Sequence, residues 1–371
     1  MKIHYNEIIS QHISILRSLQ YETGLFAAAS KKAETGYDKS WLRDNFYECL
    51  AFEVLDDWKT VQNTYKALLK IFKRHEDKIK HAITEKPKHR WQYIHARYHP
   101  LTFNEFWEEW GNKQNDSIGA ILFKIGQLAL HEEHGKSFNI LETKDDYRIV
   151  QLLVDYLQSI EYWHDADSGM WEENEEVHAS SIGACVAGLE MISRVPGITV
   201  LQSLIDNGKA ALNKLLPRES KTKFVDLSLL SLIYPYNVVS YGQAKIILEN
   251  IEYHLTKKHG VIRYKGDHYY NKNPDGHSEE AEWTFGFSWL SIIYAKYGLL
   301  KKAEHYEKKA LETVNARGEV PELYFSNSER HNENTPLGWA ESLLIVSTYE
   351  LYTKHKSSVS HETSSPAIRA E

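Results

Sequence analysis

The feature that most constrains the fold of this chain is the alternation of long and short connections between its predicted helices. Apolar residues recur at helical spacing along most of the chain, and few segments alternate as a β-strand would. Long connections are expected after helices that end near Gln20, His75, Tyr162, Leu216, Gly260 and Asn315. Short connections are expected at 55–57, 135–143, 193–198, 235–240 and 298–301. If consecutive helices pack antiparallel, all long connections lie at one end of the molecule.

This alternation predicts an all-α fold in which helical hairpins close into a double ring with one functional face. The helices are expected at 4–20, from 42, from 57, from 115, at 144–162 and 178–193, from 199, from 224 to Pro235, up to 260, at 281–297, up to 315 and at 336–354. The helix at 178–193 is rich in small residues and suits an inner ring. No linker divides residues 1–355, so we expect a single domain there. The Ser- and Thr-rich segment 356–371 predicts a disordered tail.

Composition and charge exclude several classes of protein. The net charge of -7 is scattered, whereas nucleic-acid binding would require a basic stripe. No apolar stretch approaches the roughly 18 residues of a membrane span, and the first ten residues lack the apolar run of a signal peptide. We therefore expect a cytoplasmic protein. Cys49 and Cys185 lie among apolar residues without metal or disulfide spacing, which predicts buried reduced thiols and no metal site.

The chain contains 10 tryptophans, which is many for 371 residues, and most of them fall in or beside the long connections. Any single tryptophan is explained as well by core packing. Together they favour a sugar-binding face, because flat aromatic rings cover the apolar faces of sugars while carboxylates and arginines bind the hydroxyl groups. The tryptophans concerned are Trp41, Trp91, Trp107, Trp110, Trp163, Trp171, Trp283 and Trp339.

Two carboxyl groups are candidates for acid–base chemistry. Glu172 directly follows Trp171, and an apolar neighbour raises a carboxyl pKa, as a general acid requires at neutral pH. The alternative is a solvated acidic loop, because Glu173, Glu175 and Glu176 follow.

The second candidate is Glu322, which follows Pro321 and precedes apolar residues. Glu319, Glu329 and Glu341 compete with it in the same region, and composition does not choose between them.

Arg43 and Asp44 stand at the entry to the second predicted helix. The ordinary interpretation is a capping residue with a salt bridge. The functional interpretation is a fork in which Asp44 accepts from, and Arg43 donates to, adjacent sugar hydroxyls. Arg263, Trp110 and Asp116 lie in further polar segments of the long connections. None of these segments is a phosphate loop, a zinc signature or a nucleophile elbow.

At these residues the chain resembles glycoside hydrolase family 15, the family of glucoamylases, glucodextranases and isomaltose hydrolases. It is also similar to the glucoamylase-like domains of the phosphorylase kinase alpha and beta regulatory subunits. The resemblance runs from about Tyr37 to Ile345 and rests on blocks in the family's order: YDKSWLRDN, WGNKQNDSIGA, SGMWEE, GVIRYKGDHYYN, EAEWTFGFSWL, VPELYF and PLGWAESLLI. It implies an (α/α)6 barrel of about twelve helices, in agreement with the alternating connections.

The resemblance also implies roles for the candidate residues. Glu172 would be the general acid and Glu322 the general base of a single-displacement, inverting hydrolysis. Arg43, Asp44 and Arg263 would hold the non-reducing-end glucose. The other expected substrate contacts are Tyr37, Trp41, Trp110, Asp116, Trp171, Glu173, Trp283 and Trp339. The chemistry requires neither a metal nor an organic cofactor.

The expected function is therefore an exo-acting α-glucosidase that releases β-glucose from short oligosaccharides of the isomaltose or maltose type. Few residues precede the Arg-Asp block, where bacterial members usually carry a β-sandwich, and no starch-binding module follows. Both departures favour short substrates over granular starch. The alternatives are a non-catalytic glucan-binding regulatory module, as in phosphorylase kinase, and a trehalase of the same family. The sequence leaves the linkage, the preferred chain length and the oligomeric state open.

Overall fold

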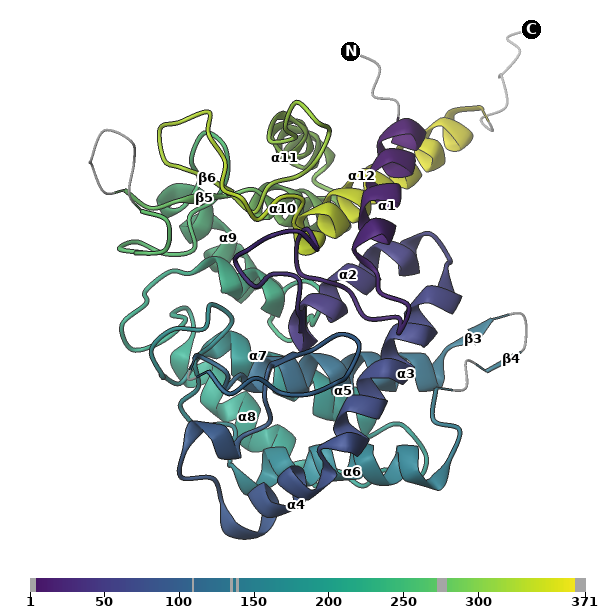
Figure 1. The fold of residues 1–371 in the computed structure, drawn as a ribbon. Coiled ribbons are helices and arrows are strands. Elements are labelled where there is room, and N and C mark those ends of the chain that lie inside the picture. Colours follow the sequence, from purple (N-terminus) through teal and green to yellow (C-terminus); the bar gives the residue numbers. More distant parts are fainter. Residues whose placement is uncertain (1–4, 109, 134–135, 138–139, 272–278, 364–371) are drawn as a thin grey trace, which may run out of the picture.

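A ring of six helices, five of them α-helices, surrounds the centre of the molecule in a computed structural model that describes residues 5–108, 110–133, 136–137, 140–271 and 279–363 (Figure 1). Neighbours in this ring pack against one another in chain order, and the last helix packs back against the first, which closes the ring. The inner helices are α2 (Leu42–Val54), α5 (Asn115–Leu130), α7 (Ala179–Ile192), the 3-10 helix η2 (Leu227–Leu232), α10 (Phe285–Lys296) and α12 (Gly338–Thr363).

An outer layer of helices covers this ring, and each of its members packs against an inner helix. The outer helices are α1 (Tyr5–Leu19), α3 (Trp58–Arg74), α6 (Lys144–Ser159), α8 (Gln202–Leu215), α9 (Tyr241–His254) and α11 (Leu300–Glu312). A further helix, α4 (Glu76–Glu85), packs on α6. This double ring is an (α/α)6 barrel, so the predicted fold class is confirmed.

Burial explains which helices form which ring. Nearly every residue of α7 and α10 is buried, whereas α3 buries one side and exposes lysines on the other. Close approach of α5 and α7 depends on glycine: a Cβ at Gly119 would lie 2.4 Å from the backbone of Ala184, and one at Gly188 would lie 2.4 Å from the Gly119 carbonyl oxygen. The small residues of α7 therefore do place it in the inner ring.

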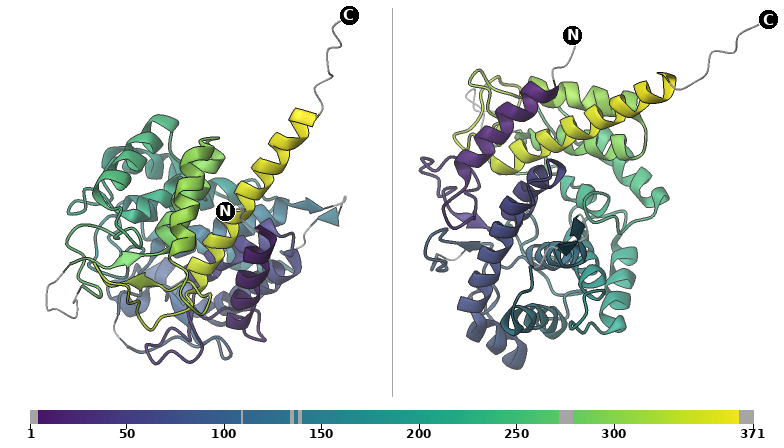
Figure 2. Two further views of the ribbon diagram at one scale, coloured as in Figure 1. Left: turned by 90° about the horizontal axis from the view of Figure 1, so that it is seen from above. Right: turned by 90° about the vertical axis from the view of Figure 1, so that its right-hand side faces the viewer.

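Several predicted boundaries need correction. The helix expected from residue 224 to Pro235 is instead the short 3-10 helix η2. Its N-cap is Asp226, whose side chain accepts a hydrogen bond from the Ser228 N–H. Helix α4 was not predicted. The tenth predicted helix starts at Phe285 because residues 282–283 form a strand. Helix α12, which was expected to end near residue 354, continues to Thr363, and its C-terminal part projects from the barrel (Figure 2). Residues 364–371 lie outside the described residues.

Short strands tie the long connections together at one end of the barrel. Strand β1 (Ser40–Trp41) pairs with β2 (Arg97–Tyr98), which joins the first and second long connections. Strand β5 (Glu282–Trp283) pairs with β6 (Leu323–Tyr324), which joins the last two. The remaining short elements are the 3-10 helix η1 (Arg90–Gln92) and the strands β3 (Glu132–Glu133) and β4 (Lys136–Ser137).

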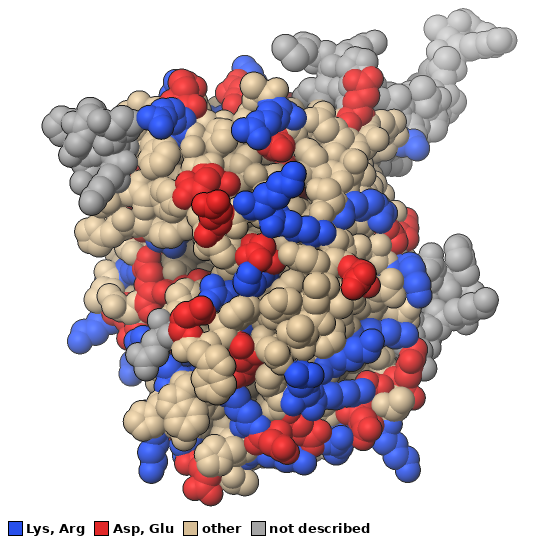
Figure 3. All heavy atoms as spheres, viewed as in Figure 1, with Lys and Arg blue, Asp and Glu red and all other residues tan. Residues whose placement is uncertain are grey.

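Three further observations bear on the composition of the chain. Across the described part of the chain, no helix has the length and apolar character needed to cross a membrane. Cys49 and Cys185 are both buried and free. Basic and acidic side chains are interspersed over the face shown in Figure 3.

Candidate active site

The long connections enclose a pocket of about 350 Å³ at their end of the barrel. Every residue predicted for the site lines this pocket except Asp116. The predicted lining residues are Tyr37, Trp41, Arg43, Asp44, Trp110, Trp171, Glu172, Glu173, Arg263, Trp283, Glu322 and Trp339. The lining is completed by four residues that were not predicted from the sequence: Ala28, His268, Tyr269 and Leu337.

Glu172 lies in a tight turn of the α6–α7 connection. Its backbone is in the left-handed region, with φ of 64°, which a residue other than glycine adopts only when its surroundings hold it there. The backbone of Gly111 lies directly against it: a Cβ at Gly111 would be 2.3 Å from the Glu172 carbonyl oxygen. The sequence therefore places a glycine where the two connections meet, and this contact fixes the turn that carries the carboxyl group.

The protonation state of Glu172 follows from its surroundings. Burial raises the pKa of Glu172 to about 7, and the nearby Asp44 carboxyl acts in the same direction. Arg43 opposes both effects, because its Nη2 donates to Glu172 Oε1 over 3.1 Å. The side chain remains 20% exposed, so the carboxyl group faces the pocket.

Arg43 is positioned from beneath the pocket. Its Nη1 donates to Gln114 Oε1 over 2.6 Å and lies 3.4 Å from Asp116 Oδ2. Asp116 is thus a buried partner of Arg43 and does not reach the pocket itself. The expected salt bridge of Arg43 at the helix entry is made with Asp116 and Glu172.

Asp44 lines the pocket one residue further along α2. Burial raises its pKa to about 6, against the lowering effect of Arg43. The N-cap position of α2 is Trp41, which makes no side-chain cap hydrogen bond, so a capping role for Asp44 has little support in this geometry.

Glu322 is held in the pocket wall by three donors. The Tyr37 hydroxyl donates to Glu322 Oε1 over 2.9 Å, and the side-chain amides of Asn332 and Asn334 donate to Oε2. Burial raises the pKa of Glu322, and these hydrogen bonds act against that rise because they stabilise the charged form. The asparagines come from the same α11–α12 connection, and no sequence pattern identified them.

The carboxyl groups that compete with Glu322 in the sequence lie elsewhere. Glu319 accepts from the Asn315 side chain, and Glu329 is exposed beside Lys258. Glu341 is buried, where it contacts His12 and accepts from the Val320 N–H. None of the three lines the pocket.

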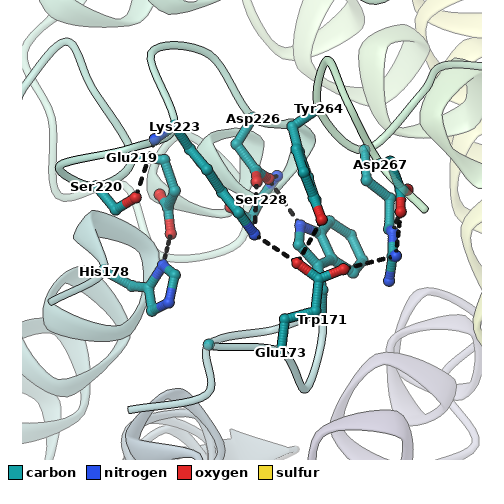
Figure 4. Close-up of polar contacts among 12 residues, drawn as sticks. Trp171, Glu173, His178, Glu219, Ser220, Lys223, Asp226, Ser228, Tyr264 and Asp267 are labelled. Carbon is teal, nitrogen blue, oxygen red and sulfur yellow. Dashed lines mark hydrogen bonds and ion pairs between the residues drawn. The ribbon is translucent and has the colours of Figure 1, made fainter. Parts of the chain in front are cut away.

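Glu173, the next residue after Glu172, lies in a polar network with Lys223 and Tyr264 (Figure 4). Its carboxyl group accepts from Arg263 Nη2 over 2.8 Å, from Lys223 Nζ over 2.9 Å and from the Tyr264 hydroxyl over 2.6 Å. Asp267 accepts from Nε and Nη2 of the same guanidinium. These donors lower the pKa of Glu173, against the effect of its burial, which keeps Glu173 an anion that orients Arg263.

Aromatic rings form the remaining walls. Trp171 lies 5.6 Å from Trp283 and 6.3 Å from Trp339 between ring centroids, and its indole N–H donates to Asp226 over 2.8 Å. The indole N–H groups of Trp41, Trp283 and Trp339 are buried without a partner among the described residues. Buried donors are nearly always satisfied, so these groups are suited to bound water or to a ligand rich in hydroxyl groups.

Three of the tryptophans noted in the sequence lie outside the pocket. Trp163 lines a separate cavity beside α8, and Trp91 and Trp107 are exposed on the α4–α5 connection. Within the described ranges, no group of three or more His, Cys, Asp or Glu residues is arranged to hold a metal ion. The site thus consists of carboxyl groups, guanidinium groups and aromatic rings.

The chain is similar in sequence to known proteins. The sequence model of glycosyl hydrolases family 15 matches residues 4–363. The phosphorylase b kinase regulatory subunit alpha of mouse liver (Mus musculus) is 26% identical over 400 residues, which cover 88% of this chain and 31% of that protein. The chain therefore spans about a third of the length of this curated relative.

Solved structures share the fold at low sequence identity. A glycosidase variant in complex with glucose superposes with a TM-score of 0.77 at 18% identity, covering 94% of this chain and 97% of that one. A bacterial glucoamylase complexed with acarbose gives a TM-score of 0.68 at 14% identity, covering 95% of this chain and 56% of that one.

Proposed function

The chain belongs to glycosyl hydrolases family 15, and on this premise we propose that it is an exo-acting, inverting α-glucosidase. Its substrates are short α-gluco-oligosaccharides of the isomaltose or maltose type, and its product is β-glucose. The observation that carries the proposal is a pair of carboxyl groups in one pocket with different environments. Burial raises the pKa of both groups, to about 7 for Glu172, but three hydrogen-bond donors stabilise the charged form of Glu322 and oppose the rise there.

These two states suit the two halves of a single displacement. Protonated Glu172 donates its proton to the glycosidic oxygen, and the bond from that oxygen to the anomeric carbon breaks. Ionised Glu322 takes a proton from a water molecule, whose oxygen attacks the anomeric carbon from the opposite face. The products are β-glucose and the shortened sugar. Glu172 is left ionised and Glu322 protonated, and proton exchange with solvent resets both.

The other lining residues suit recognition of the terminal glucose. Arg43 offers a guanidinium edge, Asp44 a carboxyl group and Arg263 a second guanidinium, all of which bind hydroxyl groups. The Tyr37 hydroxyl lies beside Glu322, where positive charge develops on the ring in the transition state. A volume of about 350 Å³ is near the lower end of the usual range for ligand pockets, which favours a small sugar. The similar solved structures hold glucose and acarbose.

The second candidate is a regulatory module that binds glucans without hydrolysing them. It is favoured by the similarity to a phosphorylase kinase regulatory subunit over 88% of the chain. In such a module the pocket would still bind sugars, but Glu172 and Glu322 would not catalyse hydrolysis.

One substrate screen separates these candidates. Purified protein is incubated with isomaltose, maltose, panose, trehalose and longer glucans, and glucose release is measured. We expect release from isomaltose or maltose, with Glu172→Gln as the inactive control.

Proton NMR of the earliest product then reports the anomer, and β-glucose is expected. Initial α-glucose would mean a covalent intermediate and would contradict the role of Glu322. Binding of maltose without hydrolysis of any sugar would favour the regulatory module, and efficient hydrolysis of trehalose alone would identify a trehalase.

A further inference from the structure

A second groove lies on the α4–α5 connection, outside the candidate active site. Its volume is about 680 Å³, larger than that of the pocket. It collects aromatic and polar side chains from α4, η1 and the segment that follows them. Its lining includes Trp91, Gln92, His95, Phe106, Trp107 and Asn112.

The tryptophans of this groove are unusually exposed. Trp107 is 101% exposed and Trp91 is 65% exposed. Large apolar side chains that gather in one place on a surface generally mark a contact site. Both residues are among the tryptophans that the sequence places in the long connections, and neither lines the candidate active site. Their ring faces are available to a ligand.

The charged groups of the groove are already paired. Lys78 Nζ lies 2.9 Å from Glu105 Oε2, and Arg90 Nε lies 2.6 Å from Glu175 Oε1. The groove therefore offers little unpaired charge to attract an ionic ligand. It combines aromatic faces with neutral amides, a combination suited to an uncharged molecule with many hydroxyl groups.

The groove adjoins the candidate active site. His95 lines the groove, Trp110 lines the pocket, and their rings stack with centroids 6.0 Å apart. The Arg97 guanidinium lies 4.9 Å from the Phe106 ring of the groove and 4.6 Å from the Trp110 ring of the pocket. Residues that line the two cavities are therefore in direct side-chain contact.

We propose that the groove is a second carbohydrate site, which binds an α-glucan chain through Trp91 and Trp107 while the pocket holds a chain end. The choice of a glucan rests on the proposed function, because the groove adjoins a pocket assigned to α-glucosides. Its consequence is that, among the oligosaccharides whose end the pocket accepts, those long enough to reach the groove are hydrolysed with a higher kcat/KM than disaccharides.

The test measures binding and turnover separately. Maltoheptaose binding is measured by titration calorimetry in the Glu172→Gln background, with and without Trp91→Ala and Trp107→Ala together. Loss of two stacking surfaces should weaken this binding about tenfold. In the active background, the same pair should lower kcat/KM for maltoheptaose by a similar factor and leave kcat/KM for maltose unchanged. Both residues are exposed, so folding should be unaffected.

Tyr253→Ala provides the matched control, because Tyr253 is an aromatic residue of α9 that is 85% exposed outside the groove. It should change neither measurement. Maltoheptaose binding that is unchanged in the double variant would overturn the proposal. A change in oligomeric state by light scattering, with sugar binding unchanged, would show a protein interface and would overturn it equally. If the protein hydrolyses no sugar, the calorimetric difference still decides the groove, so failure of the proposed function remains distinguishable.

Discussion

Arg43 donates to Glu172 over 3.1 Å, yet the pKa of Glu172 is raised to about 7. A guanidinium at this distance would ordinarily hold a carboxyl group ionised. Here burial is the larger effect, because the pocket closes around the carboxyl group and Asp44 adds negative charge. At neutral pH a substantial fraction of Glu172 therefore carries the proton that a general acid must donate.

The first prediction concerns loss of that proton. Glu172→Gln retains the shape of the side chain and cannot donate a proton, so kcat should fall by about 10²–10⁴-fold. Stability should not fall, since the substitution removes a carboxyl group whose ionised form is disfavoured in the fold. Kinetics on the best substrate and thermal unfolding at pH 8 measure the two effects. Glu175→Gln, three residues further on and outside the pocket, should leave kcat near wild type. Activity of Glu172→Gln within a few-fold of wild type would show that another group is the acid.

The second prediction is the pH dependence of kcat/KM. It should fall as the pH rises through about 7, because Glu172 loses its proton there. At the acidic end it should fall when Glu322 becomes protonated. Asn334→Ala removes a donor, 2.7 Å away, that stabilises ionised Glu322. The pKa of Glu322 should therefore rise, and the acidic limb should move to higher pH while the alkaline limb stays in place.

A pH–rate series on wild type and Asn334→Ala checks this assignment. Movement of the alkaline limb alone would mean that the two carboxyl groups have the opposite roles. The comparison depends on differences between two profiles, so a uniform loss of activity in the variant does not obscure it.

The third prediction concerns the turn that carries the acid. Gly111→Ala places a Cβ 2.3 Å from the Glu172 carbonyl oxygen, and the turn must move. A displacement of about 1 Å at a catalytic group lowers kcat by about 10²-fold, while overpacking costs about 1–3 kcal/mol of stability. Gly242→Ala is the control, because its Cβ would meet nothing within 4 Å, and it should leave kcat unchanged. Equal kcat values for the two variants would show that Gly111 does not position Glu172.

Two kinds of local pattern in the sequence predicted parts of this structure: the periodicity of apolar residues, and the identity of adjacent residues in the chain. The alternating connections gave the barrel and its functional end, because helix length and polarity can be read locally. The environment of Glu172 was predicted in direction from Trp171 beside it. The glycines and other small residues of 178–193 indicated an inner helix, because small side chains can be recognised in the sequence and permit close approach of helices.

The parts that were missed depend on hydrogen bonds between loop segments, either distant in the chain or within one connection. Residues 227–232 have the apolar character of an α-helix, but their N-terminal end is fixed by the hydrogen bond from the Leu227 N–H to the Arg263 carbonyl. Asn334 reaches Glu322 because their backbones pair within one loop, where the Glu322 N–H donates to the Asn334 carbonyl over 3.1 Å. Loop pairings of this kind leave no periodic pattern in the sequence.

The last prediction separates the two interpretations of Asp44. Its pKa of about 6 in the fold, against 3.8 for the ordinary group, means that its charge costs free energy above pH 6 and that this cost vanishes below about pH 4. Asp44→Asn should therefore raise the free energy of unfolding at pH 8, by up to about 3 kcal/mol, and by less at pH 5. The lost helix-dipole interaction, about 0.3–1 kcal/mol, is the smaller effect.

If Asp44 accepts from glucose hydroxyls, kcat/KM should nevertheless fall about 10- to 100-fold, because a charge-assisted hydrogen bond in the transition state is lost. Unfolding and kinetics measured on one preparation give opposite signs for stability and activity under this assignment. A less stable variant with normal kcat/KM would instead show that Asp44 only braces the start of α2, and the glucose-binding fork would have to be abandoned.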